Sequence, residues 1–199
     1  MAEFIHNDLV FDITDSGLAT LVQCRSSKTS VMVPAVVNHC GRVCRVVAVA
    51  DSAFKKSQCI EVNVAEGVKS IGPECFAKSS LKKLFLPKSV MSVGDLAFDE
   101  CGSLSVIRCA AKNPPEFQMA GFLNKSDVEV VVPVGSSKLY MASDGWGEFG
   151  RFSESDEVMN QTAADCGSDV MSLVASLSER VSALERRLAE FEERMSHNE

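Results

Sequence analysis

The densest group of side chains that could do chemistry in this sequence is His39, Cys40 and Cys44. A thiol beside an imidazole can become a nucleophile, and both groups bind zinc. Zinc needs four ligands, however, and no second Cys or His pair stands at zinc-finger spacing. The group also lies beside Gly41 in a polar stretch, which is typical of a hairpin tip. The sequence therefore predicts a turn here, with no metal and no cofactor.

A second candidate is Gly145-x-Gly147-x-x-Gly150, which has the glycine spacing of a dinucleotide-binding loop. That loop needs a strand before it and a helix after it, so that its backbone can approach a pyrophosphate. No apolar strand leads directly into Gly145, and residues 151–154 do not favour a helix. The chain also lacks the Gly-x-Ser-x-Gly pattern of a nucleophile elbow. We therefore expect a protein that is not an enzyme.

The elements that position these residues follow a 22-residue repeat. Phe54, Phe76 and Phe98 stand at that interval, and the eight residues before each follow one pattern, Val-x-x-Val/Ile-Gly/Ala-x-x-small. A period in the twenties predicts a solenoid, because one unit cannot bury its apolar face without its neighbours. Such a protein usually presents a surface rather than a catalytic pocket.

A second pattern lies between the aromatic residues. Residues 59–64, 81–86 and 104–109 each follow the Leu-x-x-Leu-x-Leu spacing of a leucine-rich repeat, a short strand with alternate side chains pointing inward. Residues 31–34 and 130–133 repeat the strand and its closing proline outside the three regular units. The sequence predicts about five strand rungs, of which the outer two act as caps.

Together these patterns resemble the BspA-type (treponemal) leucine-rich repeats, from about Phe11 to Phe152. The resemblance implies an N-terminal hairpin, with strands at 11–13 and 18–24, and a C-terminal cap that contains Trp146 and Phe149. The departures are small: the 22-residue intervals are short for the family, and Ala50 and Ala65 replace its usual Gly and Pro. The resemblance also implies a link with surface attachment.

Composition limits the remaining classes of protein to which this chain could belong. A chain of 199 residues that is 46% apolar can bury one core, and it holds no run of eighteen apolar residues, so we expect no membrane insertion. Residues 1–8 carry two acids and no Lys or Arg, which does not favour a secretory signal. Cys59, Cys75 and Cys109 stand at inward positions, where cysteine behaves as a small apolar residue. We therefore expect a cytoplasmic protein, with surface display by an unconventional route left open.

The net charge of −7 lies entirely near the C-terminus. Residues 154–199 hold 11 acidic side chains and four arginines, whereas residues 1–153 hold 16 acids and 16 bases. A neutral repeat region followed by an acidic segment argues against binding to nucleic acid, which needs a basic face.

We predict a repeat domain at 1–153, a polar linker at 154–167 and a coiled-coil helix at 168–197. The helix is predicted because apolar residues recur every seven positions, which calls for a partner helix. Arg and Glu flank this stripe so that a parallel assembly would pair them. The expected oligomerisation residues are Val170, Val174, Leu177, Arg180, Val181, Leu184, Glu185, Arg187, Leu188, Phe191, Glu192 and Met195.

Two features of the sequence bear on the number of helices in that coiled coil. Val at one heptad position with Leu at the other favours a dimer. Residues 180–185 and 187–192, however, both match Arg-h-x-x-h-Glu, in which h is an apolar residue, and this pattern resembles a trimerisation motif of short coiled coils. We favour a homotrimer over a dimer, and a solitary helix packed on the repeats is the third possibility.

Five positions between the inward residues of the predicted strands should point outward: Met32, Asn63, Phe85, Arg108 and Val131. Aromatic, Met and Arg side chains are enriched at protein-binding faces. The alternative is that the linker or the tail helix covers Phe85 in the same chain.

The fold class predicted is thus mainly β with a C-terminal α-helix: a short leucine-rich-repeat solenoid followed by a parallel coiled coil. The function predicted is a non-enzymatic scaffold that binds protein through this face and is multimerised by its tail. The alternative is a structural or surface component, such as an adhesin or appendage subunit. The sequence does not identify the partner.

Overall fold

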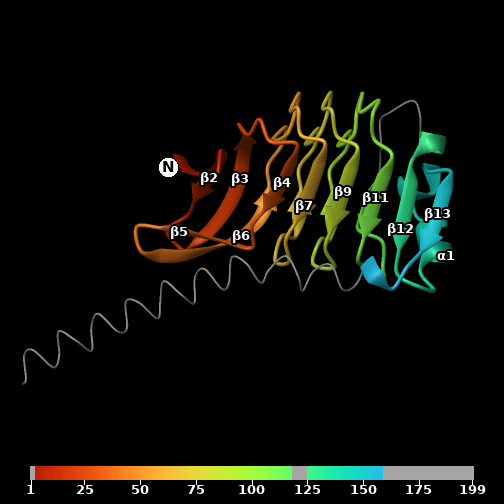
Figure 1. Cartoon of the computed structure of the whole chain (residues 1–199). Coiled ribbons are helices and arrows are strands. Elements are labelled where there is room, and N and C mark those ends of the chain that lie inside the picture. Colours follow the sequence, from red (N-terminus) through yellow and green to blue (C-terminus); the bar gives the residue numbers. More distant parts are fainter. Residues whose placement is uncertain (1–2, 118–124, 159–199) are drawn as a thin grey trace, which may run out of the picture. The chain divides into compact units, whose positions relative to one another are not determined.

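The structure is a computed structural model, and it describes residues 3–117 and 125–158. All of these residues belong to one unit, Met1–Thr162. The unit is mainly β, with two sheets whose strands follow one another along the solenoid (Figure 1). Among the described residues, no helix is long and apolar enough to cross a membrane.

The first sheet begins with an antiparallel hairpin and continues as parallel strands. Its order is β1-β2-β3-β6-β8-β10, and β5 also pairs with β6. The strands are β1 (Glu3–His6), β2 (Leu9–Ile13), β3 (Leu18–Cys24), β5 (Val36–His39), β6 (Arg42–Val49), β8 (Ser70–Ile71) and β10 (Ser92–Val93). The predicted hairpin is confirmed as β2 and β3, with its turn closed by the amide of Gly17 on the carbonyl of Thr14 at 2.9 Å.

The second sheet is parallel, and its order is β13-β12-β11-β9-β7-β4. Its strands are β4 (Ser30–Val33), β7 (Glu61–Val64), β9 (Lys83–Leu86), β11 (Val106–Cys109), β12 (Glu129–Val132) and β13 (Arg151–Glu154). The first five are the predicted rungs. The prediction of about five was one short, because β13 pairs in parallel with β12 and extends the sheet. Strand β13 also ends at Glu154, one residue inside the segment predicted as linker.

The 22-residue period appears in the backbone as well as in the side chains. Two positions in each turn, two residues before and two after the repeating Phe, adopt the left-handed conformation with φ between 51° and 60°. They are Ser52, Glu74 and Leu96 before the rings, and Lys56, Lys78 and Glu100 after them. Amides of one coil also donate to carbonyls of the next, as from Phe54 to Cys75 at 2.8 Å and from Phe76 to Ala97 at 2.9 Å. Each coil is therefore a copy of the one before it, joined by hydrogen bonds that would otherwise stay unpaired in the interior.

The core is a ladder of aromatic rings. Phe54 and Phe76 stack with centroids 5.3 Å apart, and Phe76 and Phe98 with centroids 5.9 Å apart. Phe117 then meets Phe98 edge to face at 5.7 Å and continues the ladder into the C-terminal cap. Offset-stacked and edge-to-face pairs at these distances contribute stability beyond the burial of their area.

The C-terminal cap closes the core with two buried aromatic side chains. It consists of η1 (Lys125–Asp127), α1 (Ser137–Met141) and η2 (Trp146–Glu148) together with the last two strands. The hydroxyl of Tyr140 donates to the carbonyl of Ala111 at 2.8 Å, and the indole N–H of Trp146 donates to the carbonyl of Pro115 at 2.7 Å. The cap that the resemblance implied at Trp146 and Phe149 is therefore present. The predicted coiled coil at 168–197 and residues 159–167 lie outside the described residues.

Candidate protein-interaction surface

The five residues predicted to point outward lie in one row across the parallel sheet. Met32 pairs with Asn63, Asn63 with Phe85, Phe85 with Arg108, and Arg108 with Val131. Strand β13 extends this row by Ser153, which pairs with Val131. Parallel strands in register place equivalent side chains side by side at about 4.8 Å per strand. We call these six residues the outer row.

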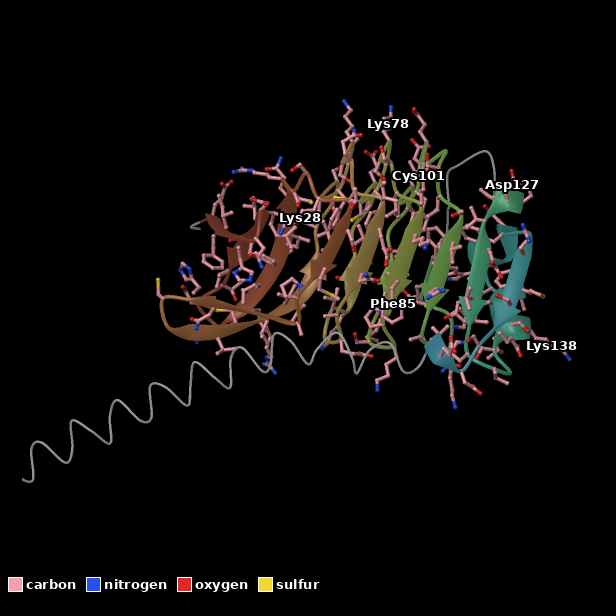
Figure 2. The ribbon with its side chains drawn as sticks, viewed as in Figure 1. Lys28, Lys78, Phe85, Cys101, Asp127 and Lys138 are labelled. Carbon is pink, nitrogen blue, oxygen red and sulfur yellow. The ribbon has the colours of Figure 1, made fainter. Side chains whose placement is uncertain are left out.

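Exposure differs sharply along the outer row. Arg108 is exposed, whereas Met32, Asn63 and Val131 are partly buried. Phe85, labelled in Figure 2, is 6% exposed because it packs with Ala110 and with Val158, the last described residue. Phe85 lies on the outer face, as predicted, but its side chain is covered rather than exposed. The alternative that the segment after the repeats covers Phe85 agrees with its contact with Val158, although the binding role of the row stays a prediction.

A second row on the same face alternates in charge. Glu61 pairs with Lys83, and Glu129 pairs with Arg151, with Val106 between the two pairs. Neighbouring side chains of opposite charge stabilise a sheet modestly. This row is therefore balanced, and the exposed guanidinium of Arg108 stands beside it.

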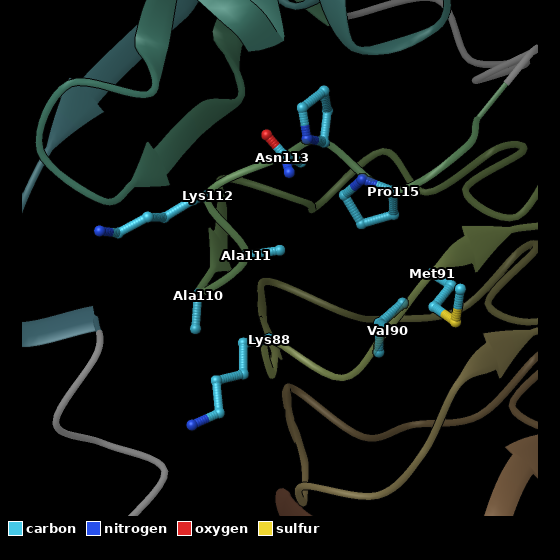
Figure 3. A pocket seen from close by; sticks show the side chains of 9 residues that line it. Lys88, Val90, Met91, Ala110, Ala111, Lys112, Asn113 and Pro115 are labelled. Carbon is cyan, nitrogen blue, oxygen red and sulfur yellow. The ribbon is translucent and has the colours of Figure 1, made fainter.

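A groove of about 530 Å³ lies at the ends of β9 and β11, where the chain leaves the sheet. It adjoins the outer row, because Ala110 both lines the groove and packs on Phe85. Figure 3 shows its side chains, which are Lys88, Val90, Met91, Ala110, Ala111, Lys112, Asn113, Pro114 and Pro115. Met91 is 67% exposed, and the two lysines are the charged residues of the lining, which contains no carboxylate.

Sequence reasoning missed this groove. Its lining comes from two coils about 22 residues apart, and of its residues only Val90 belongs to the repeated pattern. The Pro114-Pro115 pair, which marks a change of direction after the last regular coil, is the one signal that could have suggested a hollow there.

The histidine–cysteine group lies at a hairpin tip, as expected. Strands β5 and β6 pair antiparallel around Cys40 and Gly41, whose φ angles are 51° and 76°. The thiol of Cys40 lies 3.5 Å from Nε2 of its neighbour His39, whereas Cys44 is buried in the hydrophobic core. Within residues 3–117 and 125–158, no three His, Cys, Asp or Glu side chains come together to hold a metal ion.

The Gly145-x-Gly147-x-x-Gly150 segment forms part of the C-terminal cap. A Cβ on Gly145 would stand 2.1 Å from the carbonyl oxygen of Phe117, so this glycine is needed for packing. The shallow hollow of about 510 Å³ beside it is lined by Asp144 and Glu148, whose charge opposes a pyrophosphate. The predicted role in the cap, rather than in nucleotide binding, agrees with this geometry. The twelve predicted oligomerisation residues, from Val170 to Met195, lie outside the described residues.

Comparisons with known proteins agree with this architecture. Residues 47–133 match the BspA type leucine-rich repeat region, in six copies. The resemblance inferred from the sequence is thus confirmed for that segment. No curated protein matches the chain.

Two solved structures share the fold. A leucine-rich repeat protein from Bacteroides capillosus is 24% identical, with a TM-score of 0.53, and the alignment covers 64% of this chain and 91% of that one. A leucine rich cell surface protein from Faecalibacterium prausnitzii is 19% identical, with a TM-score of 0.50 over 68% of this chain. This chain spans 38% of the length of that second protein.

Proposed function

We propose that this chain is a non-enzymatic scaffold that binds a partner protein through the exposed part of the outer row and the adjoining groove. The observation that carries the proposal is the composition of that surface. The groove combines an exposed methionine with an apolar floor, and through Ala110 it adjoins the outer row, in which Arg108 is exposed. Leucine-rich repeats of this kind usually present an extended surface to another protein.

The positive charge of the surface indicates which side chains the partner should carry. Lys88 and Lys112 rise from the groove, Arg108 lies in the neighbouring outer row, and the groove lining has no acid to neutralise them. A partner segment that combines carboxylates with one or two apolar side chains would satisfy both the lysines and the apolar floor. We therefore infer an acidic, partly apolar segment as the bound element.

Phe85 supports this surface as a buried side chain that packs on Ala110. Its ring is covered by Val158, so a charge introduced there would be buried and would destabilise the sheet. A loss of binding after Phe85→Glu would therefore not separate recognition from folding. Arg108 is the better test, because its side chain is exposed.

The experiment is affinity capture from the native source with the full chain and its variants. Arg108→Glu combined with Lys112→Glu is compared with Lys69→Glu, a charge reversal at an exposed residue beside β8 on the other sheet. We expect the double variant to lose a partner that the control retains, with both folded by circular dichroism. A partner bound equally by both would refute the docking surface.

The proposal includes multimerisation by residues 168–197, which would present several copies of the surface and raise avidity. Its support is the heptad pattern of the sequence. Sedimentation equilibrium of the full chain, whose protomer mass is 21.5 kDa, should give three protomers per particle. A chain that ends at Thr162 should sediment as a monomer. A monomeric full chain would refute the proposed multimerisation and leave the proposed docking surface untouched.

A further inference from the structure

Two cysteines from different layers of the solenoid meet near its N-terminal end. Cys24 is the last residue of β3, and Cys59 stands two residues before β7. Their sulfur atoms lie 3.8 Å apart, although 35 residues separate them in sequence. The amide of Cys24 donates to the carbonyl of Ala53 at 2.8 Å, which holds the end of β3 against the first coil. Cys59 is fully buried, whereas Cys24 is partly exposed.

We propose that Cys24 and Cys59 are a dithiol site that a small hydroperoxide oxidises to a disulfide, which fastens the N-terminal hairpin to the first regular coil. The inference is independent of the proposed docking function. A disulfide needs the two sulfurs at about 2.05 Å. The two thiols, now 3.8 Å apart, would have to approach by about 1.7 Å for the bond to form.

The reaction balances with one peroxide. The thiolate of one cysteine of the pair attacks one oxygen of hydrogen peroxide, the O–O bond breaks, and a sulfenic acid forms while the released hydroxide is protonated to water. The sulfur of the other cysteine then attacks the sulfenic sulfur, the S–S bond forms, and the hydroxyl group leaves with the proton of that second thiol as a second water. Two thiols lose two electrons in total, and one hydroperoxide gains them.

The hydrogen bond between the two thiols favours the loss of one proton from the pair. It lowers the pKa of Cys59 and raises the pKa of Cys24, and burial and the charge of Asp8 also raise the pKa of Cys24. Two thiols paired in this way supply a thiolate more readily than an isolated buried thiol.

Other buried cysteines lack this arrangement. Burial raises the pKa of Cys75 and of Cys109, and the thiol of Cys109 accepts a hydrogen bond from the Tyr140 hydroxyl at 3.1 Å. They are expected to stay reduced, because reactivity with peroxide follows thiolate character.

The disulfide would stabilise the N-terminal end of the solenoid. A terminal coil has a neighbour on one side, so it opens more readily than the coils between. Joining Cys24 to Cys59 closes the intervening loop that contains β4, β5 and β6, and it restricts the unfolded chain. We expect the oxidised protein to melt at a temperature higher by roughly 5 °C or more.

The test treats the full-length protein with one equivalent of hydrogen peroxide, blocks the remaining thiols with N-ethylmaleimide and maps the peptides by mass spectrometry. We expect a linked pair of peptides that contain Cys24 and Cys59, with a mass lower by two hydrogens. In Cys24→Ser and in Cys59→Ser the link cannot form, and peroxide should no longer raise the melting temperature of either variant.

Cys40→Ser provides the matched control, since Cys40 is exposed and outside the pair. It should leave both the link and the rise in melting temperature unchanged. A folded wild-type protein that forms no link between these residues would overturn the proposal. So would a linked protein that melts no higher than the reduced one, because the inferred fastening of the hairpin would then be wrong.

Discussion

The rings of Phe76 and Phe98 lie almost parallel, with planes 8° apart and centroids separated by 5.9 Å. These two residues occupy the same place in successive coils. Their contact shows how the repeat is stabilised: the ring of Phe76 is buried between the rings of Phe54 and Phe98. The ladder therefore transmits the effect of a change at one ring to two neighbouring coils.

Replacement of Phe76 by Ala should be among the most damaging changes to this protein. The ring is 1% exposed and stacks on Phe54 as well as on Phe98, so its removal leaves a cavity between two coils. We expect a loss of about 3–5 kcal/mol in the free energy of unfolding. Urea denaturation measures it, and Met91→Ala, at a side chain that is 67% exposed, should change the same quantity by less than about 0.5 kcal/mol.

Gly94→Ala should destabilise the stack of coils, although alanine is a small residue. A Cβ at this position would stand 2.3 Å from the backbone nitrogen of Pro73 in the coil before it, so the backbones would have to separate. Gly102→Ala is the matched control, because nothing lies within 4 Å of its added Cβ. Thermal unfolding should show a lower melting temperature for the first variant and little change for the second. Equal melting temperatures would mean that the coils separate at no cost.

Tyr140→Phe should weaken the C-terminal cap while keeping its packing. The lost hydroxyl donates to the carbonyl of Ala111, and both residues are buried. An acceptor left without a donor in the interior costs about 1–3 kcal/mol. Denaturant unfolding of the variant measures this loss. A variant as stable as the original would indicate that water reaches the Ala111 carbonyl.

Stability at acid pH should depend on Glu154. Its carboxylate accepts hydrogen bonds from the backbone around Gly135 and from Ser137 at the start of α1, and these lower its pKa to about 2. Because the folded-state pKa lies below the unfolded value of about 4.5, the contribution is complete above pH 4.5 and is lost as the pH falls towards 2.

Glu154→Gln tests this dependence. At neutral pH the variant should unfold at a lower urea concentration than the original chain. The difference should shrink between pH 4.5 and pH 2 and vanish below that range. A difference that stays constant with pH would show that the amide and the carboxylate differ in packing rather than in charge.

Much of this fold could be predicted because the repeat is local and periodic. The spacing of Phe54, Phe76 and Phe98 indicates the stacked rings, and the alternation in each strand indicates which side chains enter the core. Ala50, which replaces the expected glycine, stands in the first coil, where its amide donates to the carbonyl of Leu21 in the N-terminal hairpin rather than to an identical coil.

The repeat pattern by itself also determined that the residues of the outer row share one face, because strands of equal phase must place them side by side. Only the tertiary structure decided which of them remain open. The contact of Val158 with Phe85, the extra strand β13, the groove beside Ala110 and the approach of Cys24 to Cys59 all depend on where non-repeating segments return. A repeat fixes the relation of each coil to the next through shared hydrogen bonds and stacked rings, whereas a segment outside it is positioned by whichever apolar surface it can cover.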